Sequence, residues 1–597
     1  MLTRTNYCGS LRASHVGQTV VVCGWVNTYR DQGRGLVFCD LRDREGLVQV
    51  VFDLEDVAPD VVTAARGLRR EDVIAVQGVV RRRAGEANAR LATGEVEIVG
   101  RTLEVLSKTE PPPILPDEHD AEKIAEETRL RYRYIDLRRP RMQHILRTRS
   151  RVTKFARDYF AGQGFLEIET PLLIKSTPEG ARDFIVPSRL HPGSWYALPQ
   201  SPQLFKQILM VAGFDRYLQI CKCLRDEDPR ADRQAEFTQI DLEMSFVQRE
   251  QVIETMSGFA RGLWKEILGI EIPAIPTMTY REAMDRFGID RPDTRFGLEI
   301  VDVSEIARTM DFRVFADALA RKTGVVKAIR VPGGAETLTR KTTDAWAEWV
   351  KTFKAGGLPT VKLGANGFET GIAKFLAGDA GARAGEALKT KLGLVPGDAV
   401  LFAADTHSIA TKTLGEVRLR AARELKLIPE GRWNFLWVID FPMFEYDEEH
   451  ARWVAMHHPF TSPNPDQFPL LESDPGACLS AGYDLVVNGS EIGGGSIRIH
   501  STAVQERVFG LIGLTAEDAE RKFGFLLRAL RHGAPPHGGI AFGLDRLVMH
   551  LVGTDNIRDV IAFPKTQNGA DLMIEAPSAV EAEQLDELRV RSVAPTG

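Results

Sequence analysis

Residues 224–243 read LRDEDPRADRQAEFTQIDLE, and this stretch decides the fold of the chain. The residues just before it, Arg216–Ile220, are apolar and aromatic, whereas Phe237–Phe246 alternates polar with apolar side chains. Both patterns are typical of β-strands. The segment between them carries both charge signs and a proline, so the sequence predicts an antiparallel hairpin with a long charged loop. Charge density alone would favour a solvated surface hairpin.

The order of side chains in this hairpin indicates a nucleotide site. Arg225 can bind a phosphate, Glu227 can accept a hydrogen bond from an exocyclic amine, and Phe237 can stack under a purine ring. The string resembles the second signature motif of class II aminoacyl-tRNA synthetases, and its whole length matches the aspartyl-type enzymes of bacteria. The resemblance implies that Arg225, Asp226, Glu227, Gln234 and Phe237 bind ATP.

Length and composition limit the alternatives. With 597 residues, the chain has room for roughly three to five domains of ordinary size. A content of 44% hydrophobic and 26% charged residues is that of a soluble globular protein. No apolar run approaches the roughly 18 residues of a membrane helix, and the N-terminus lacks the apolar core of a secretory signal. We therefore expect a cytoplasmic protein that does not span a membrane.

Cysteine spacing and net charge narrow the chemistry further. The six cysteines include no Cys-x-x-Cys pair and no Cys/His set at zinc spacing, so reduced thiols are expected and a structural zinc site is not. A net charge of −6 argues against a protein that coats nucleic acid indiscriminately. Any RNA contact must therefore come from local patches.

Residues 1–107 contain five short apolar or alternating runs broken by glycine, with a helical stretch at Ala58–Leu68 after the third run. Five strands with a helix after the third are typical of an OB-fold barrel. Such barrels frequently read single-stranded nucleic acid, although they also bind sugars or proteins. The synthetase resemblance implies a domain that reads the tRNA anticodon.

The same resemblance assigns four side chains of the barrel to the anticodon. Phe38 would stack on a base, Gln49 and Glu95 would hydrogen-bond to base edges, and Arg30 would hold backbone phosphate. Strand alternation puts Phe38 on the face opposite its two neighbours, which allows an exposed ring; a core aromatic is the alternative.

Residues 108–140 are predicted to be a linker or hinge. Four prolines between Lys108 and Pro116 favour a stiff extended segment. Nine arginines follow between Arg129 and Arg151. Such runs are mostly solvated helix faces. Between an RNA-reading barrel and the next domain they also suggest a phosphate-binding role, in which Arg138 and Arg139 would contribute to tRNA binding.

Residues 141–289 are predicted to form the first part of a catalytic domain. Arg141–Gln163 has the apolar spacing of an amphipathic helix, and an expected strand follows that ends at Pro171. This helix, strand and proline resemble the first class II motif, which implies a homodimer interface. An ordinary core helix and strand would show the same pattern.

The segments 177–183 and 197–207 resemble the amino-acid pocket of the family. A free amino acid brings an ammonium, a carboxylate and a side chain, and each needs its own partner in a partly desolvated site. The resemblance assigns Glu179 and Gln203 to the ammonium end and Lys206 to the side-chain carboxylate. By pattern alone, Lys206 would be a surface lysine at the start of a helix.

Residues 290–430 hold no class II motif, and we expect an inserted α+β domain like the one that marks the bacterial aspartyl enzymes. Helices are expected at Thr339–Lys354 and Thr413–Leu425. The glycine clusters of this region lack P-loop spacing, so loops are favoured over a phosphate site.

Residues 431–597 are predicted to complete the catalytic domain and to end in a polar tail. Phe435–Pro442 is an apolar run typical of a buried strand. His457 and His458 follow, and adjacent histidines in an extended chain point opposite ways and rarely share one metal ion. The resemblance instead places His457 over bound aspartate, on a loop that closes on substrate.

The stretch Tyr483–Arg498 carries two carboxylates and three adjacent glycines. Asp484 and Glu491 are seven residues apart across a strand and a turn, and such hard carboxylates suit a Mg²⁺ ion that bridges ATP phosphates. Arg498 can hold a carboxylate with two parallel hydrogen bonds. By the resemblance, that carboxylate is the side chain of the substrate aspartate.

The last motif, Gly538–Met549, is a strand that enters a helix at a glycine, and it resembles the third class II motif. The resemblance implies that Arg546 reaches the γ-phosphate of ATP and that the ATP-binding residues here are Glu491, Gly543, Leu544, Asp545 and Arg546. Beyond this motif, Ile561–Lys565 is expected to be a core strand.

The resulting expectation is an α+β multidomain protein: an N-terminal OB-fold barrel, a class II catalytic domain built on an antiparallel sheet, and an inserted α+β domain. The resemblance covers almost the whole chain and implies a homodimeric aspartate–tRNA ligase that uses ATP with Mg²⁺, L-aspartate and tRNA(Asp). Arg225 and Arg546 are the expected catalytic residues. The expected aspartate contacts are Glu179, Gln203, Lys206, Arg225, Asp241, His457 and Arg498.

Three alternatives follow from the same residues. An enzyme that also charges tRNA(Asn) would have the same catalytic site. An asparaginyl ligase is disfavoured, because Lys206 and Arg498 would face a neutral amide as buried cations without a counter-charge. A catalytically silent RNA-binding relative would be expected to lose motif residues, and these are present.

Overall fold

The computed structural model describes residues 1–116, 123–177 and 180–593. The chain forms two compact units. The first comprises Met1–Ser150, Asp228–Asp232 and Thr554–Ala579, and the second comprises Arg151–Glu227, Arg233–Gly553 and Val580–Gly597. Within the described ranges, none of the helices combines the length and the apolar character needed to cross a bilayer.

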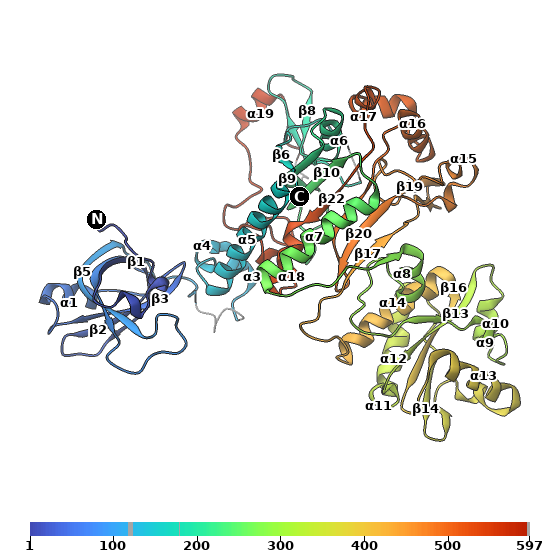
Figure 1. The fold of residues 1–597 in the computed structure, drawn as a ribbon, viewed down its shortest axis with the longest axis horizontal. Helices are drawn as coiled ribbons and strands as arrows, with labels where there is room; N and C mark the ends of the chain where they lie inside the picture. Colours follow the sequence, from blue (N-terminus) through green and yellow to red (C-terminus); the bar gives the residue numbers. More distant parts are fainter. Residues whose placement is uncertain (117–122, 178–179, 594–597) are drawn as a thin grey trace. The chain divides into compact units, whose positions relative to one another are not determined.

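The first unit contains a closed five-stranded barrel (Figure 1). Its strands are β1 (Thr19–Asp31), β2 (Leu36–Asp43), β3 (Gly46–Asp53), β4 (Val73–Arg82) and β5 (Val96–Ser107), in the order β1-β2-β3-β5-β4. The helix α1 (Pro59–Arg66) follows the third strand. Inward side chains such as Val22, Val50 and Val76 are fully buried. The expectation of an OB-fold barrel is confirmed, because period-two alternation lets each strand bury one face.

The other regular elements that the structure describes in the first unit are all helical. They are η1 (Cys8–Ser10), η2 (Ala13–His15), α3 (Glu126–Arg131), α4 (Arg133–Asp136), the start of α5 (Pro140–Gly162) and η6 (Ile557–Asp559). Arg133 is buried and donates hydrogen bonds to the carbonyl oxygens of Arg558, Ile561 and Ala562. The strand expected at Ile561–Lys565 is wrong, since the chain bends there and its carbonyls bond to an arginine side chain.

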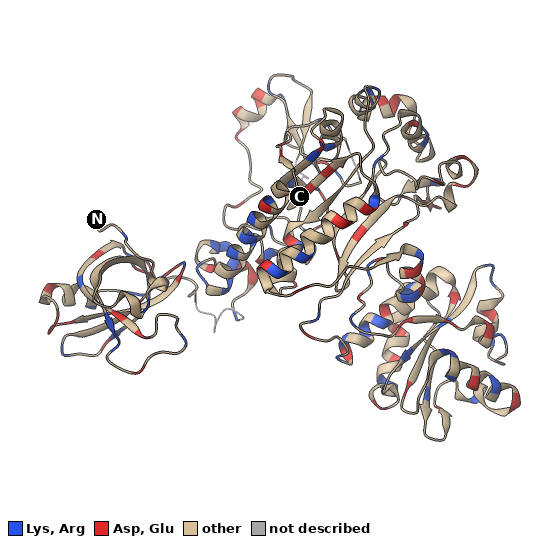
Figure 2. Cartoon of the chain, in the orientation of Figure 1, with Lys and Arg blue, Asp and Glu red and all other residues tan. Residues whose placement is uncertain are grey.

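The arginine-rich segment carries many basic side chains (Figure 2), but its arginines are not all solvated. Arg139 is 5% exposed and donates to Asp136 at 2.9 Å. Arg138 donates to buried Glu71 at 2.9 Å and lies over the Trp25 ring, 5.1 Å from its centre. Glu71 also pairs with Arg42 and Asp136 with Arg133, so each carboxylate is shared by two arginines, and the phosphate-binding role of Arg138 and Arg139 stays a prediction.

The second unit is organised around an eight-stranded sheet in the order β11-β17-β20-β21-β22-β10-β9-β6. The strands are β6 (Leu166–Glu167), β9 (Arg216–Leu224), β10 (Glu236–Ser245), β11 (Thr277–Thr279), β17 (Phe435–Ile439), β20 (Gly482–Val487), β21 (Ser490–Ile497) and β22 (His537–Gly543). Neighbours are antiparallel except at the two edges, where β11 runs parallel to β17 and β6 to β9. The predicted hairpin is the β9–β10 pair, and the expected antiparallel catalytic sheet is confirmed.

Helices pack on this sheet through aromatic side chains. Phe259 of α7 (Arg249–Leu268) lies 4.8 Å from Phe160 of α5 and 5.2 Å from Phe542 of β22, between ring centres. The other helices of this region are α6 (Gln203–Val211), α15 (Leu470–Ser473), α16 (Thr502–Leu511), α17 (Ala516–Leu530), α18 (Leu544–Val552) and α19 (Ala582–Leu588). Two small ribbons and one short helical turn complete it: β7 (Ile185–Pro187) with β8 (Trp195–Ala197), β18 (Phe444–Asp447) with β19 (Arg452–Ala455), and η5 (Pro475–Ala477).

A separate five-stranded sheet lies in the sequence between β11 and β17, in the order β12-β13-β16-β14-β15. Its strands are β12 (Ile300–Asp302), β13 (Gly324–Val331), β14 (Thr360–Gly364), β15 (Gly367–Glu369) and β16 (Ala399–Thr406). Its helices are α8 (Tyr280–Phe287), α9 (Ser304–Ala307), α10 (Arg313–Leu319), α11 (Gly334–Thr337), α12 (Arg340–Trp349), η3 (Val350–Phe353), η4 (Ala373–Leu376), α13 (Gly378–Leu392) and α14 (His407–Glu424). This part of the chain is α+β, and α14 begins at His407, earlier than the predicted Thr413.

Candidate active site

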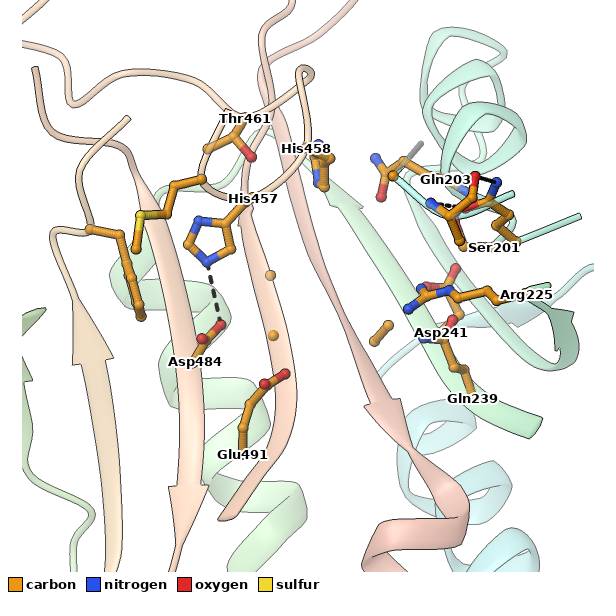
Figure 3. Close-up of a pocket in the computed structure, with 18 of the residues that line it drawn as sticks. Ser201, Gln203, Arg225, Gln239, Asp241, His457, His458, Thr461, Asp484 and Glu491 are labelled. Atoms are coloured by element: carbon orange, nitrogen blue, oxygen red, sulfur yellow. Dashed lines mark hydrogen bonds and ion pairs between the residues drawn. The ribbon is translucent and has the colours of Figure 1, made fainter. Parts of the chain in front are cut away.

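A cavity of about 490 Å³ in the second unit gathers side chains from segments that are far apart in the sequence. The helix α6, the strands β10, β20, β21 and β22, and the loop that contains His457 all contribute lining residues. The predicted site residues that line the cavity are Gln203, Lys206, Arg225, Glu227, Asp241, His457, Asp484, Glu491 and Arg498. Figure 3 shows Asp484 and Glu491 on one side and Arg225, Gln203 and Asp241 on the other.

The other predicted ATP residues surround the cavity without lining it. Arg225 lies over the ring of Phe237, 5.1 Å from its centre. Asp226 accepts from Arg182 at 2.6 Å, and Arg546 donates to the Glu491 carbonyl oxygen at 2.5 Å. Gln234, Leu544 and Asp545 are buried. Gly543 caps the start of α18. The predicted aspartate contact Glu179 lies outside the described residues.

Lys206 is a buried lysine whose ammonium group lies close to three protein acceptors. Its Nζ lies 2.7 Å from Asp241 Oδ1, 3.3 Å from Glu243 Oε2 and 3.3 Å from the Leu242 carbonyl oxygen. An ammonium group has three N–H donors, and two of them form hydrogen bonds here, so one donor remains for a substrate carboxylate beside Glu243.

Arg498 has partners for four of its five N–H donors among the described residues. Its Nε and Nη2 donate to the two oxygens of Glu243 at 2.9 and 3.1 Å, and its Nη1 lies 2.7 Å from Ser496 Oγ and from His458 Nε2. Burial and the charge of Arg498 hold the pKa of His458 well below its usual range, so this imidazole stays neutral and accepts the hydrogen bond. Burial alone would raise the pKa of Glu243, but Arg498 and Lys206 together lower it.

The two carboxylates of β10 correct the sequence argument against an asparagine substrate. That argument assumed that Lys206 and Arg498 would lack a counter-charge. Asp241 and Glu243 supply one each, so the pair of cations is balanced before any substrate binds. Charge balance therefore does not separate aspartate from asparagine in this cavity.

Arg225 differs from both of these cations. Of the residues that the structure describes, no carboxylate forms an ion pair with it, and its Nε is buried without a hydrogen-bond partner. Among the lining Lys and Arg side chains it is thus the one that has no carboxylate partner in the described part of the chain. Such a cation suits an anionic ligand, above all a phosphate.

Asp484 and Glu491 converge over Gly494. A Cβ placed on Gly494 would lie 2.7 Å from Asp484 Oδ1 and 3.2 Å from Glu491 Oε1, so both carboxylates border the space that the glycine leaves open. The charge of Asp484, together with burial, raises the pKa of Glu491 above its usual range. A divalent cation would relieve this repulsion, so the donor set fits the expected Mg²⁺.

Three of the four expected anticodon residues, Arg30, Phe38 and Gln49, lie close together in the barrel, and Glu95 does not join them. Phe38 is half-buried, while Val37 and Cys39 are fully buried. Arg30 lies over the Phe38 ring, 5.8 Å from its centre, and its Nη2 is 3.4 Å from Gln49 Oε1. Glu95 is exposed before the start of β5.

Glu97, which sequence reasoning did not name, is the acidic residue that contacts Gln49, while the assignment of Glu95 to a base edge stays a prediction. Gln49 Nε2 donates to Glu97 Oε2 at 2.8 Å, and Arg81 Nε donates to Glu97 Oε1 at 2.9 Å. The two strands pair Gln49 with Glu97. Alternation along Glu95, Val96 and Glu97 puts both acidic residues on one face, so only the strand register could distinguish them.

Two further acidic residues of the cavity region were also missed. Glu243 could have been found, because it lies two positions after Asp241 on a strand and therefore shares its face. Asp290 lines the cavity from the segment that leads into the inserted sheet. No local motif marks Asp290 in the sequence.

The family description "tRNA synthetases class II (D, K and N)" matches residues 125–567, and "OB-fold nucleic acid binding domain" matches residues 20–106. The chain belongs to the class II tRNA synthetases of this group. This membership agrees with the antiparallel sheet and with the cavity on it.

Curated relatives match over the full length. The chain is 51% identical over 593 residues to "Aspartate--tRNA(Asp/Asn) ligase" of Geotalea uraniireducens, which covers 99% of this chain and 98% of the relative. It is 51% identical over 592 residues to "Aspartate--tRNA ligase" of Bacillus licheniformis, with 99% of each covered. The asparaginyl-tRNA synthetase of Pyrococcus horikoshii, solved with asparaginyl-adenylate, has the same fold with a TM-score of 0.58 at 19% identity, covering 95% of this chain and 99% of that one.

Proposed function

We propose that this chain is an aspartate–tRNA ligase. An α-carboxylate oxygen of L-aspartate attacks the α-phosphorus of ATP, the bond between that phosphorus and the bridging oxygen breaks, and pyrophosphate leaves. The terminal ribose hydroxyl of tRNA(Asp) then attacks the carbonyl carbon of the aspartyl-adenylate, and AMP leaves. No side chain has to form a covalent bond, so the protein contributes positioning and electrostatic stabilisation.

The observation that carries the proposal is that Arg225 has no carboxylate partner among the described residues, in a cavity whose other Lys and Arg side chains are paired with carboxylates. The guanidinium of Arg225 lies over the Phe237 ring, so it suits the α-phosphate of a nucleotide whose base stacks on that ring. We assign Arg225 to the charge that develops on the α-phosphate. Arg546, at the start of α18, is assigned to the γ-phosphate.

We assign the aspartate to the opposite part of the cavity. Asp241 Oδ2 and Gln203 Nε2 are buried without a hydrogen-bond partner among the described residues. Buried polar atoms are nearly always satisfied, and the α-ammonium of an amino acid would satisfy Asp241, while Gln203 can donate to an acceptor on the same ligand. Lys206, Arg498 and His457 are assigned to its side-chain carboxylate, and Glu179 stays assigned to the ammonium end.

The remaining nucleotide assignments are Asp226, Glu227, Gln234, Glu491, Gly543, Leu544 and Asp545. Bound Mg²⁺ would neutralise phosphate charge, and Asp484 and Glu491 are the residues that would hold it. Gly494 leaves the space between those two carboxylates open.

The barrel is assigned to the anticodon through Phe38, Arg30, Gln49 and Glu95. In this division of the chain, residues 1–107 read tRNA, 108–140 link the barrel to the catalytic domain, 141–289 and 431–597 carry the catalytic motifs, and 290–430 form an insertion.

A homodimer is supported by half-exposed Leu166, Leu172 and Leu173 at or after the edge strand β6, because an uncovered apolar sheet edge favours association. We propose a cytoplasmic location, where ATP and tRNA are available as substrates.

The test is aspartate attachment, with ATP and Mg²⁺, to transcripts of tRNA(Asp) and tRNA(Asn) in parallel. Charging of tRNA(Asp) alone is the result expected of a discriminating enzyme. Charging of both is the second candidate, which the name of the Geotalea relative favours. Charging of neither, with tRNA binding intact, would overturn the proposal and favour a catalytically silent RNA-binding relative.

A further inference from the structure

The imidazole of His457 occupies a slot between the proposed Mg²⁺ ligand Asp484 and two residues, Phe441 and Gly482, that have no part in the proposed chemistry. Phe441 meets the ring edge-on, with ring centres 4.7 Å apart. Asp484 Oδ1 lies 3.7 Å from His457 Nε2, and Figure 3 shows this pair. On another side the ring lies against Gly482, where an added Cβ would come within 3.1 Å of His457 Cε1. The position of His457 therefore depends on where Phe441 and Gly482 are held.

The residue before Phe441 is Asp440, whose backbone is in the left-handed region with φ of +57°. Side chains other than Gly, Asn and Asp seldom adopt this conformation, and where it occurs it requires support from the surroundings. The turn at Asp440 ends β17 and directs Phe441 into the cavity wall.

One oxygen of Asp440 receives that support from two directions. Arg249 Nη1, at the start of α7, donates to Asp440 Oδ1 at 2.6 Å, and Asn464 Nδ2 donates to the same oxygen at 3.0 Å. Asn464 lies seven residues after His457, at the far end of the loop that carries it. The carboxylate thus joins the end of β17, the helix α7 and the histidine loop.

Backbone hydrogen bonds extend this connection to Gly482. The Phe441 carbonyl oxygen accepts from the Ser480 N–H at 2.7 Å, and the Asn464 N–H donates to the Leu479 carbonyl oxygen at 2.9 Å. The segment 479–482 is therefore held between Phe441 and Asn464 just before it reaches the imidazole.

We propose that Asp440 is a positioning residue for aspartate recognition: through its left-handed turn and its hydrogen bonds to Arg249 and Asn464, it sets His457 over the substrate. The inference rests on the proposed function, in which His457 contacts the aspartate side chain. Asp440 itself does not line the cavity.

The test compares Asp440→Gly, Asp440→Asn and Asn464→Ala in aspartate-dependent ATP–pyrophosphate exchange. Glycine accepts the left-handed backbone but removes the carboxylate, so Asp440→Gly should raise KM for aspartate about tenfold or more, as expected when a binding group is misplaced. Its KM for ATP should stay within about twofold, because only the aspartate end is disturbed. Asn464→Ala should act in the same direction, and Asp440→Asn, which keeps an acceptor and tolerates the turn, should recover most of the affinity.

The decisive measurement is the same Asp440→Gly change in a His457→Ala background. A residue that acts through His457 should add little once that imidazole is gone. An undiminished effect in that background, or equal rises of both KM values, would overturn the proposal and assign Asp440 a general structural role. Thermal unfolding of each variant checks that it is folded, and Asp466→Asn, an exposed carboxylate two residues after Asn464, is the matched control.

Gly482→Ala provides an independent approach that leaves the Asp440 hydrogen bonds intact. The added methyl meets His457 Cε1 at 3.1 Å and Ser480 Oγ at 3.0 Å, and Gly482 does not have a positive φ that would strain an alanine. Gly482→Ala should raise KM for aspartate and leave KM for ATP unchanged. An unchanged KM for aspartate would overturn the claim that this slot positions His457. Absence of aspartate-dependent exchange in the unmodified protein is a different outcome, because it would overturn the proposed function and this inference with it.

Discussion

Replacement of Arg225 by alanine tests the central electrostatic claim. Arg225 is the lining cation without a carboxylate partner among the described residues, so its charge is available to the α-phosphate. Loss of one preorganised charged contact of this kind typically costs about 2–4 kcal/mol of transition-state stabilisation. That free energy corresponds to a rate reduction of about 30- to 1,000-fold at 25 °C.

Because Arg225 has no carboxylate partner among the described residues, its replacement should change the free energy of unfolding little. No ion pair is broken, and the contact of Arg225 with the Phe237 ring contributes about 0.5–1 kcal/mol at an exposed or half-exposed site. We therefore expect Arg225→Ala to fold normally and to bind tRNA with nearly unchanged affinity. Burial of the paired cations Lys206 and Arg498 makes them unsuitable for this comparison, since their loss leaves carboxylates without partners.

The assay is aspartate-dependent ATP–pyrophosphate exchange, with tRNA binding measured separately by filter retention. Lys222→Ala is the matched control, because Lys222 lies three residues earlier, is 52% exposed and pairs only with Glu236 at 3.4 Å among the described residues. Exchange by Arg225→Ala within about threefold of the unmodified protein, a loss below 1 kcal/mol, would refute the reasoning.

Three further predictions follow from the geometry. Lys206→Met leaves Asp241 and Glu243 buried with Arg498 as the remaining paired cation, so urea unfolding should show a loss of about 3–5 kcal/mol; a loss below about 1 kcal/mol would mean that the pair is solvated. Gly494→Ala places a methyl 2.7 Å from Asp484 Oδ1, so the Mg²⁺ concentration for half-maximal exchange should rise about tenfold or more, and unchanged Mg²⁺ dependence would remove these carboxylates from the metal site. Arg139→Met removes a buried partner of Asp136, so the free energy of unfolding should fall while the salt dependence of tRNA binding stays the same. If the slope of log affinity against log salt concentration became smaller by about one, the phosphate-binding hypothesis would be supported instead.

Local periodicity was sufficient to predict the strands of the barrel and of the β9–β10 hairpin. Val37, Phe38 and Cys39 alternate in burial as the period of two requires. The motif residues were predicted through the resemblance to the class II motifs, since by pattern alone Lys206 would be a surface lysine, and Lys206, Arg225, Asp241 and Glu491 do line one cavity. Side-chain chemistry and spacing are properties of the sequence, so these predictions needed no tertiary information.

The ion-pair partner of each charged side chain could not be predicted in the same way. Arg498 pairs with Glu243 across 255 residues of sequence, and Arg138 pairs with Glu71 across 67. A charge has a different free energy when it is solvated, paired or buried alone, and folding decides which of these applies. The sequence alone therefore determined the class of chemistry and the strands that carry it, whereas the tertiary structure decided which charges are paired and which, like that of Arg225, have no carboxylate partner among the described residues.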